Sequence, residues 1–267
     1  HIEAGLRTGN DRDPFPEEAN RRLIDHLAQL HFAPTPHAAA NLRREGLCDS
    51  TIAVTGNTIV DAVQAAASAD IAAILPDLRA ARQIVTVTCH RRENWGARLL
   101  SICTAIRALI AATPELVVVF ALHGNRALAT RIRAALDGTP RLHLLAPLPF
   151  AHFLALLKAS ALVLTDSGGV QEEAISLQRP VLVCRDASER PEGTDTGLMR
   201  IVGTNAATLA AAAGEWLSQA PVGDTVNPFG DGRASARIAE ALARWSSGHT
   251  PLLAPERQFQ GAAMVPA

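Results

Sequence analysis

The sequence predicts an α/β protein built on a parallel sheet, because short apolar runs alternate regularly with helical patterns. Runs rich in Val, Leu and Ile are typical of strands that helices cover on both faces. Five of them occupy residues 84–88, 116–122, 142–145, 161–165 and 181–184. Ligands of such sheets bind beyond the carboxyl ends of the strands, so the polar residues after these runs are the first candidates for a site.

Composition excludes several classes of function. The 267 residues are 48% hydrophobic, which suits one large domain or two modest ones. A formal net charge of -1 gives no electrostatic reason to expect a nucleic-acid or membrane partner. With no apolar run of membrane-spanning length and no signal-peptide pattern, we expect a cytoplasmic protein. The cysteines form no CxxC pair and are expected to be reduced and to bind no metal; they are Cys48, Cys89, Cys103 and Cys184.

The chain before residue 57 predicts the end of a separate α/β unit. A strand is expected to end just before His1, with Glu3 at its carboxyl edge. Pro16 opens a helix, because proline and acidic residues suit a first helical turn. Its apolar residues recur at helical spacing and predict the buried face. They are Leu23, Ile24, Leu27 and Leu30, with His26 beside them.

The run at 161–165 leads into Asp166-Ser-Gly-Gly-Val-Gln-Glu-Glu173 and a helical pattern. Glycines let backbone N–H groups approach a ligand closely, and a helix N-terminus favours an anion, so the stretch suits a phosphate cradle. Glu173 lies one helical turn further on, where a carboxylate can accept hydrogen bonds from two ribose hydroxyls. The stretch thus indicates a nucleoside diphosphate site, although an ordinary strand-to-helix turn has the same pattern.

Other polar residues follow the predicted strands and should meet the cradle at one edge of the sheet. They are His90, Asn94, His123 and Asn125, together with Ser167 and Glu173. Taken alone, these residues have structural explanations. A histidine at a strand end often has backbone groups as its hydrogen-bond partners. The charged residues after His90, namely Arg91, Arg92 and Glu93, could form an exposed ion pair, which contributes little stability.

A family resemblance rests on several blocks in a fixed order. The blocks are His1-Ile-Glu-Ala-Gly-Leu-Arg-Thr, Pro16-Glu-Glu-Ala-Asn-Arg, Thr55-Gly-Asn-Thr, His90-Arg-Arg-Glu-Asn, Asp166-Ser-Gly-Gly-Val-Gln-Glu-Glu, Ser188-Glu-Arg-Pro-Glu and Asn227-Pro-Phe-Gly-Asp-Gly. To about Trp245, the chain resembles the non-hydrolysing UDP-N-acetylglucosamine 2-epimerases of bacteria. Blocks matched in order are far more specific than any one of them.

The resemblance implies a fold of the GT-B type, with two Rossmann-like domains facing a cleft. The first domain would be largely missing here, with residues 1–56 as its C-terminal remnant. Residues 57–226 would form the complete UDP-binding second domain, and 227–245 a helix returning to the first. Residues 246–267, rich in Pro, Gly and Ala, are expected to be disordered. The 267 residues alone are therefore expected to have low activity.

The resemblance also implies the reaction, which interconverts UDP-N-acetylglucosamine and UDP-N-acetylmannosamine for cell-surface polysaccharide. Elimination of UDP gives 2-acetamidoglucal, and re-addition inverts C2. Such chemistry needs carboxylates near C1 and C2 and a cradle for the diphosphate, but no cofactor and no metal. A homodimer is implied for the full-length protein. The alternatives are a hydrolysing relative that releases N-acetylmannosamine and UDP, an epimerase for a modified sugar, a GT-B glycosyltransferase, and a UDP-binding fragment without activity.

The resemblance assigns roles to individual residues. The catalytic set comprises Glu3, Glu17 and His90, of which either glutamate could be acid or base. Residues expected to bind the UDP-sugar are Arg21, Leu148, Phe153, Ser167, Gly168, Gly169, Glu173 and Arg190. Some members hold a second, regulatory UDP-sugar, for which the candidates here are Arg91, Glu93 and His123. The prolines that usually flank this histidine in the family are absent here.

Overall fold

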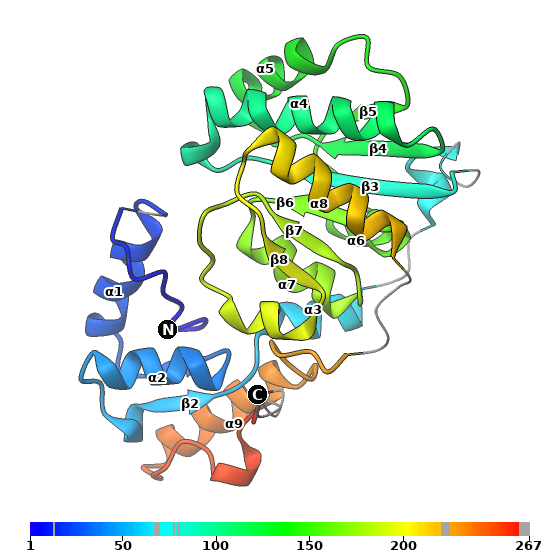
Figure 1. The fold of residues 1–267 in the computed structure, drawn as a ribbon. Coiled ribbons are helices and arrows are strands. Elements are labelled where there is room, and N and C mark those ends of the chain that lie inside the picture. Colours follow the sequence, from blue (N-terminus) through cyan, green and yellow to red (C-terminus); the bar gives the residue numbers. More distant parts are fainter. Residues whose placement is uncertain (13, 67–69, 77, 79–80, 220–224, 262–267) are drawn as a thin grey trace. The chain divides into compact units, whose positions relative to one another are not determined.

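The computed structural model describes residues 1–12, 14–66, 70–76, 78, 81–219 and 225–261 (Figure 1). Two compact units make up the chain. Unit 1 comprises residues 1–65, 189–196 and 226–267, and unit 2 comprises residues 66–188 and 197–225.

Unit 2 is built on a six-stranded sheet in which all strands run parallel. Its strands are β3 (Gln83–Thr88), β4 (Leu116–Ala121), β5 (Leu142–Leu145), β6 (Leu162–Thr165), β7 (Val181–Val183) and β8 (Met199–Ile201). The prediction of an α/β fold with a parallel sheet is confirmed. Our count of five strands was one short, because β8 has only three residues and Arg200 interrupts its apolar pattern.

Helices cover both faces of this sheet. One face packs against α4 (Ala97–Ala112), α5 (Arg126–Leu136) and α8 (Ala206–Ser218) in the largest apolar core. The other face of the sheet is covered by α6 (Phe150–Ala159) and α7 (Gly168–Ser176) (Figure 1). Neighbouring residues of β3 alternate between the layers: Val85 joins the first core, and Ile84 packs against Leu156 of α6. Short 3-10 helices cover Ile71–Ala73 and Arg92–Asn94.

The strand order β5-β4-β3-β6-β7-β8 is the order of a doubly wound nucleotide-binding sheet. From β3 the chain moves outward to β5 and then returns to place β6 on the other side of β3. Thr88 and Thr165, at the carboxyl ends of these two strands, lie side by side in the register. The connections diverge at this point, and a crevice at such a switch point is where ligands bind.

In its described part, unit 1 contains a two-stranded parallel sheet and four α-helices. The strands are β1 (His31–Ala33) and β2 (Ile52–Val54), and an isolated bridge joins Ile2 to Phe32. The α-helices are α1 (Glu17–Leu27), α2 (Pro36–Arg44), α3 (Thr58–Ala65) and α9 (Ala234–Ser246). The 3-10 helices are Asp49–Thr51, Pro191–Thr196 and Pro255–Arg257.

Two of the sequence blocks hold each other in unit 1. The Asn57 N–H donates to the Phe229 carbonyl at 2.7 Å. A Cβ on Gly230 would lie 3.1 Å from Cγ2 of Val60 and 3.3 Å from the Asn57 nitrogen, so a larger residue would press on both. Asp61 of α3 then accepts from the Ala234 N–H and closes the first turn of α9. These blocks therefore have a structural role.

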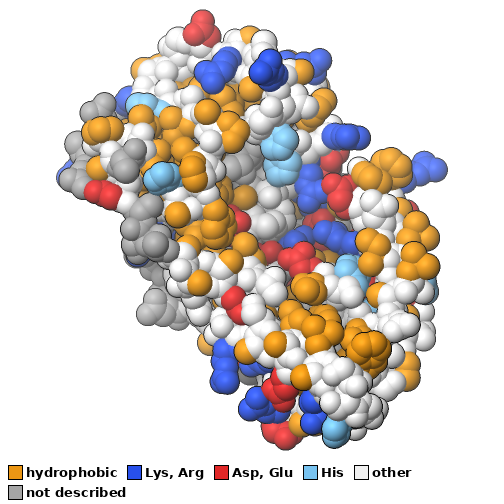
Figure 2. Space-filling model, turned by 180° about the vertical axis from the view of Figure 1, so that it is seen from behind, with side chains coloured by type: hydrophobic (Ala, Val, Ile, Leu, Met, Phe, Trp, Pro, Cys, Tyr) orange, Lys and Arg blue, Asp and Glu red, His pale blue; other side chains and the backbone are white. Residues whose placement is uncertain are grey.

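The buried face of α1 is the reverse of our prediction, and of the predicted apolar residues only Leu30, which follows the helix, is buried. Leu23, Ile24 and Leu27 are exposed, whereas Glu18 and Asp25 are buried. The carboxylates can be buried because each has partners: Glu18 accepts from the N–H groups of Thr8 and Gly9, and Asp25 binds His1 and Arg7. Hydrophobic side chains are exposed along the right-hand side of Figure 2, on which α1 lies.

The expectation of disorder after residue 246 is wrong as far as Gly261. Leu252, Leu253 and Phe259 are buried, and Leu252 and Leu253 pack with Ile238 of α9. The Phe259 N–H donates to the Val54 carbonyl at 3.0 Å, which adds the segment to the edge of β2. Three apolar side chains thus anchor a segment whose Pro and Gly content suggested disorder. Residues 262–267 lie outside the described part.

The reversed face of α1 predicts contrasting effects of two substitutions. Leu27→Gln should change the free energy of unfolding by less than about 0.5 kcal/mol, because the side chain is 84% exposed. Asp25→Asn should cost roughly 3–5 kcal/mol, because it removes the charge that Arg7 contacts at 2.6 Å in a buried site. Urea unfolding of the two variants measures both values. A larger cost for Leu27→Gln than for Asp25→Asn would show that α1 packs by its apolar side.

Candidate active site

The predicted phosphate cradle lies at the carboxyl end of β6, at the switch point of the sheet. Ser167 is the N-cap of α7, and its own N–H donates to Thr165 Oγ1 at 3.0 Å. Its side chain makes no capping hydrogen bond, so the first N–H groups of the helix are not satisfied by that hydroxyl. An added Cβ on Gly169 would meet no described atom within 4 Å. Ser167, Gly168 and Gly169 therefore form a helix N-terminus that has open space beside Gly169.

Asp166 organises the neighbouring loop, and no role was predicted for it from the sequence. Its buried carboxylate accepts from the N–H of His90 at 3.0 Å and from the N–H of Arg91 at 3.0 Å. It also accepts from Asn94 Nδ2 at 2.9 Å and from Cys89 Sγ at 3.2 Å. The available signal was its position, between the end of a buried strand and the Ser-Gly-Gly turn.

His90 stands at the end of β3 against this carboxylate. Its Nδ1 lies 3.4 Å from Asp166 Oδ1, and its ring stacks on His123 with centroids 5.3 Å apart. Burial lowers the pKa of His90, and the charge of Asp166 opposes that shift. The neutral imidazole can therefore accept a proton near neutral pH, while an arriving anion would favour the imidazolium.

A cavity of about 200 Å³ opens beside these groups. It brings together four residues that were predicted separately, namely His90, His123, Leu148 and Phe153. Its full lining is Thr88, Cys89, His90, Ala121, Leu122, His123, Gly124, Pro147, Leu148, Phe153 and Val170. Val170 belongs to α7, so the cradle helix contributes one wall. An apolar cavity with a few convergent polar groups is the usual form of a small-molecule site.

Glu173 is a buried carboxylate of α7, only 9% exposed. Its Oε2 finds no hydrogen-bond partner among the described residues. Burial, with a smaller contribution from Glu172, raises the pKa of Glu173 to about 7. A buried acceptor left without a donor is costly, and a ligand that supplies hydroxyl donors would remove that cost.

The remaining candidates belong to unit 1. Glu3 follows the bridging residue Ile2 and has a φ of 62°, which is uncommon for a residue other than glycine and is often found at functional sites. Glu17 is the first residue of α1. Arg21 Nη1 donates to Glu189 Oε1 at 3.3 Å, and Nη1 of Arg190 lies 3.5 Å from the other oxygen.

Glu189 is the buried carboxylate between these two arginines, and no role was predicted for it from the sequence. It is 1% exposed, and it holds Arg21 and Arg190 around one carboxylate. The signal that could have revealed it was its place directly before Arg190. The structure thus groups these three residues.

The candidate regulatory residues have structural partners in unit 2. The backbone of Arg91 is bound by Asp166, and His123 stacks on His90. Oε1 of Glu93 lies 3.7 Å from Nε of Arg185, which is only 2% exposed. In the described residues, no group of three or more His, Cys, Asp or Glu side chains could hold a metal ion.

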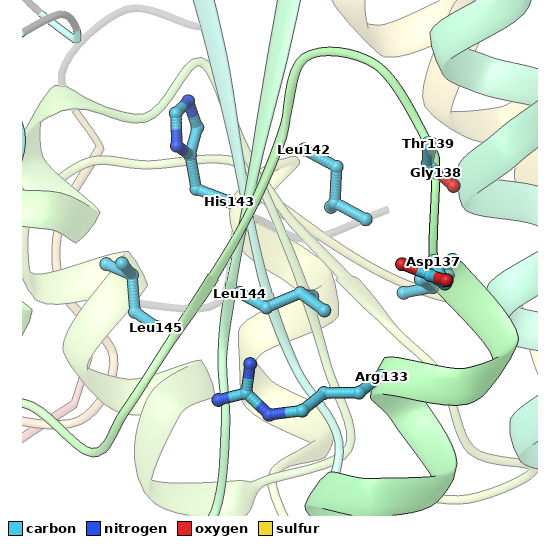
Figure 3. A pocket seen from close by; sticks show the side chains of 9 residues that line it. Arg133, Asp137, Gly138, Thr139, Leu142, His143, Leu144 and Leu145 are labelled. Atoms are coloured by element: carbon cyan, nitrogen blue, oxygen red, sulfur yellow. The ribbon is translucent and has the colours of Figure 1, made fainter.

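A second cavity, of about 360 Å³, lies beside β5 and α5 (Figure 3). Leu142 and Leu144 point to the side of β5 that faces Arg133 of α5, whereas His143 and Leu145 point to the other side. None of the predicted site residues lines this cavity. We assign the candidate site to the smaller cavity, because the polar groups of the switch point converge there.

Comparison with protein families identifies the chain. A family model described as "UDP-N-acetylglucosamine 2-epimerase" matches residues 1–243. The chain belongs to the UDP-N-acetylglucosamine 2-epimerase family. It is 42% identical to a probable UDP-N-acetylglucosamine 2-epimerase of Ralstonia nicotianae over 255 residues, covering 91% of this chain and 68% of the relative. It is 40% identical to the enzyme of Salmonella typhimurium, with the same coverage.

Solved structures have the same fold. S. aureus MnaA in a co-structure with UDP gives a TM-score of 0.87 at 36% identity, covering 98% of this chain and 72% of the other. The Neisseria meningitidis epimerase bound to UDP-GlcNAc gives 0.84 at 36% identity, covering 91% and 69%. The family and the GT-B-like fold that the sequence blocks indicated are confirmed. Among the described helices, none is both long and apolar enough to span a bilayer.

The raised pKa of Glu173 predicts how stability varies with pH. The folded protein binds the Glu173 proton more tightly than the unfolded chain does. The free energy of unfolding should therefore decrease as pH rises from about 4.5 through about 7. The loss amounts to about 3 kcal/mol. Glu173→Gln should remove this loss, so the free energy of unfolding of the variant should increase relative to that of the parent protein as pH rises. Urea unfolding at about pH 5 and about pH 8 tests this.

The matched control is Glu115→Gln, which changes a carboxylate that is 59% exposed. Its effect on the free energy of unfolding should be small at both pH values. A constant difference between Glu173→Gln and the parent protein across the pH range would show that Glu173 is charged when folded.

Proposed function

We propose that the protein is a non-hydrolysing UDP-N-acetylglucosamine 2-epimerase, an isomerase that converts UDP-GlcNAc to UDP-ManNAc and back. The observation that carries the proposal is the group at the switch point, a helix N-terminus beside a histidine and an unsatisfied buried carboxylate. Family membership and relatives solved with UDP and with UDP-GlcNAc support the nucleotide sugar as substrate.

The chemistry starts with the bond between C1 and the diphosphate. As that bond loosens, C1 gains oxocarbenium character and the C2 proton becomes acidic enough to remove. Loss of UDP from C1 and of the proton from C2 gives 2-acetamidoglucal. Re-addition of UDP at C1, with protonation of C2 from the other face, inverts C2. The site must therefore supply carboxylates for the proton at C2 and positive groups for the leaving oxygen.

The residues take the following roles in this proposal. Glu3 and Glu17 act at the sugar as acid, base or stabiliser of the oxocarbenium. His90 acts at the leaving phosphate. The diphosphate lies at the N-terminus of α7, where Gly168 and Gly169 offer N–H groups beside the hydroxyl of Ser167.

Polar and apolar residues together bind the rest of the nucleotide. Glu173 accepts from the ribose hydroxyls, Phe153 packs on the uracil, and the backbone of Leu148 contacts its edge. Arg21 and Arg190 bind further polar groups of the UDP-sugar. Because binding favours charged Glu173, affinity for UDP should increase with pH up to about 7 and then level off.

The biological setting is part of the proposal. The product would supply ManNAc-type sugars for bacterial cell-surface polysaccharide. The enzyme would work in the cytoplasm, as a homodimer at its full natural length. The sugar supply and the dimer follow from the resemblance to the family.

The reaction is tested with UDP-GlcNAc in deuterated water, followed by proton NMR at C1 and C2. We expect deuterium at C2 and a manno sugar still attached to UDP, because the C2 proton leaves and solvent supplies its replacement. The 267-residue chain and the full natural protein are run side by side. This comparison also tests the expectation that the 267 residues alone have low activity.

Other products would contradict the proposal. Free N-acetylmannosamine with UDP would identify a hydrolysing enzyme, in which water intercepts the intermediate. No exchange at C2 in the full natural protein would favour a modified sugar or a glycosyltransferase. Retention of the C2 proton with formation of the manno sugar would exclude elimination as the mechanism.

Gly169→Ala tests the cradle with little disturbance of the fold. Its added methyl group meets no described atom within 4 Å, and alanine favours a helix, so stability should be unchanged or rise by up to about 1 kcal/mol. A diphosphate lying on this turn would clash with the methyl group. We expect UDP affinity by calorimetry to fall roughly tenfold or more.

Gly214→Ala is the matched control, because Gly214 lies within α8 and an added Cβ there also meets no described atom. It should raise stability similarly and leave UDP affinity unchanged. Equal affinities of the two variants would place the diphosphate away from the α7 N-terminus.

A further inference from the structure

We propose that Asp166 is a positioning residue for His90: it holds the imidazole with Nδ1 toward its carboxylate and leaves Nε2 free for the leaving diphosphate. This inference rests on the proposed function, because it names a residue that prepares the same site. Asp166 itself would not touch the substrate.

The main support is the way one carboxylate fixes both the backbone and the ring of His90. The His90 N–H donates to Oδ1 at 3.1 Å and to Oδ2 at 3.0 Å. The ring of the same residue places Nδ1 3.4 Å from Oδ1. Since backbone and ring both face Asp166, the far edge of the imidazole, with Nε2, points away from the carboxylate.

The tie spans the switch point of the sheet. Asp166 directly follows β6, whereas His90 and Arg91 follow β3, and the two strands are neighbours. Asn94 Nδ2 donates to Asp166 Oδ2 at 2.9 Å and to the Cys184 carbonyl at 3.0 Å, which fixes the far end of the loop. In each hydrogen bond that the described residues form with the Asp166 side chain, Asp166 is the acceptor, as expected of an ionised carboxylate.

A second restraint acts on the face of the ring. His123, after β4, stacks on His90 with an angle of 14° between the ring planes. Asp166 therefore fixes one edge of the imidazole and His123 fixes one face. The charged or titratable groups facing His90 are Asp166, Arg91, His123 and Glu93. Of these, Asp166 is fully buried and lies against Nδ1.

This arrangement determines what His90 can do when UDP leaves. The imidazolium donates from Nδ1 toward Asp166 and from Nε2 toward the phosphate oxygen that gains charge as the C1–O bond breaks. Burial disfavours the imidazolium, and the adjacent carboxylate stabilises it. An aspartate that orients and stabilises a histidine in this way is typical of hydrolytic triads, although the reaction here is different.

The first test needs no substrate and leaves Asp166 intact. The chain is labelled with 15N-histidine, and the signal of His90 is assigned by comparison with His90→Gln. We expect the neutral ring to carry its proton on Nδ1, because that proton is nearest the carboxylate. A neutral ring protonated on Nε2 would overturn the proposal, and this result does not depend on an Asp166 variant folding.

The second test uses Asp166→Asn, which keeps the shape and removes the charge. We expect the pKa of His90 to fall, because the imidazolium loses its stabilising carboxylate. In the full natural protein, kcat should fall on the order of tenfold or more, with KM for UDP-GlcNAc changing less than about twofold. The limb of the pH profile that reports His90 should move to lower pH.

Asn94→Ala is the matched control for a merely structural role. It removes a donor to the same carboxylate and loosens the same loop, yet keeps the charge of Asp166 against His90. Its thermal midpoint should fall, while the pKa and tautomer of His90 stay as in the parent protein. If Asn94→Ala changes them as much as Asp166→Asn does, or if Asp166→Asn changes neither, the proposal is overturned.

The outcomes also separate this inference from the proposed function. Tautomer and pKa are measured without substrate, so they decide the role of Asp166 even if no deuterium enters C2. Conversely, an active epimerase with His90 protonated on Nε2 would keep the proposed function and exclude Asp166 as the positioning residue.

Discussion

The hydrogen bonds of Asp166 are the interaction on which the candidate site depends. Two parallel strands, β3 and β6, end side by side at the switch point, and the chain leaves them in different directions. Backbone N–H groups after β3 would be left without partners there. One buried carboxylate from the end of β6 accepts from them, and it thereby holds His90 beside the N-terminus of α7.

The buried carboxylates of this protein divide by whether they have partners. Asp166, Asp25 and Glu18 each accept from several donors, so their burial is compensated and they support the fold. Glu173 keeps an oxygen without a donor among the described residues, and burial raises its pKa to about 7. The burial of Glu173 is therefore not compensated at that oxygen, in contrast to the burial of the other three carboxylates.

Periodicity predicted the sheet well and the surface of α1 poorly. Strands β3 to β7 are rich in Val, Leu and Ile, and such runs between helical patterns are typical of buried parallel strands. On α1, the same logic predicted that Leu23 and Leu27 are buried, whereas they are exposed and the buried face carries carboxylates with hydrogen-bond partners. Periodicity measures apolar spacing along one helix and carries no information on partners such as Arg7, which lies 18 residues from Asp25.

The sequence by itself determined the fold class, the family, and the residues that gather at the carboxyl ends of the strands. Short motifs sufficed because each turn or cradle is local in the chain. Only the tertiary structure decided that Asp166 binds the loop of His90, 76 residues away, that His123 stacks on that ring, and that Glu173 is buried. Burial and long-range hydrogen bonds arise from packing among distant elements, and no local pattern records them.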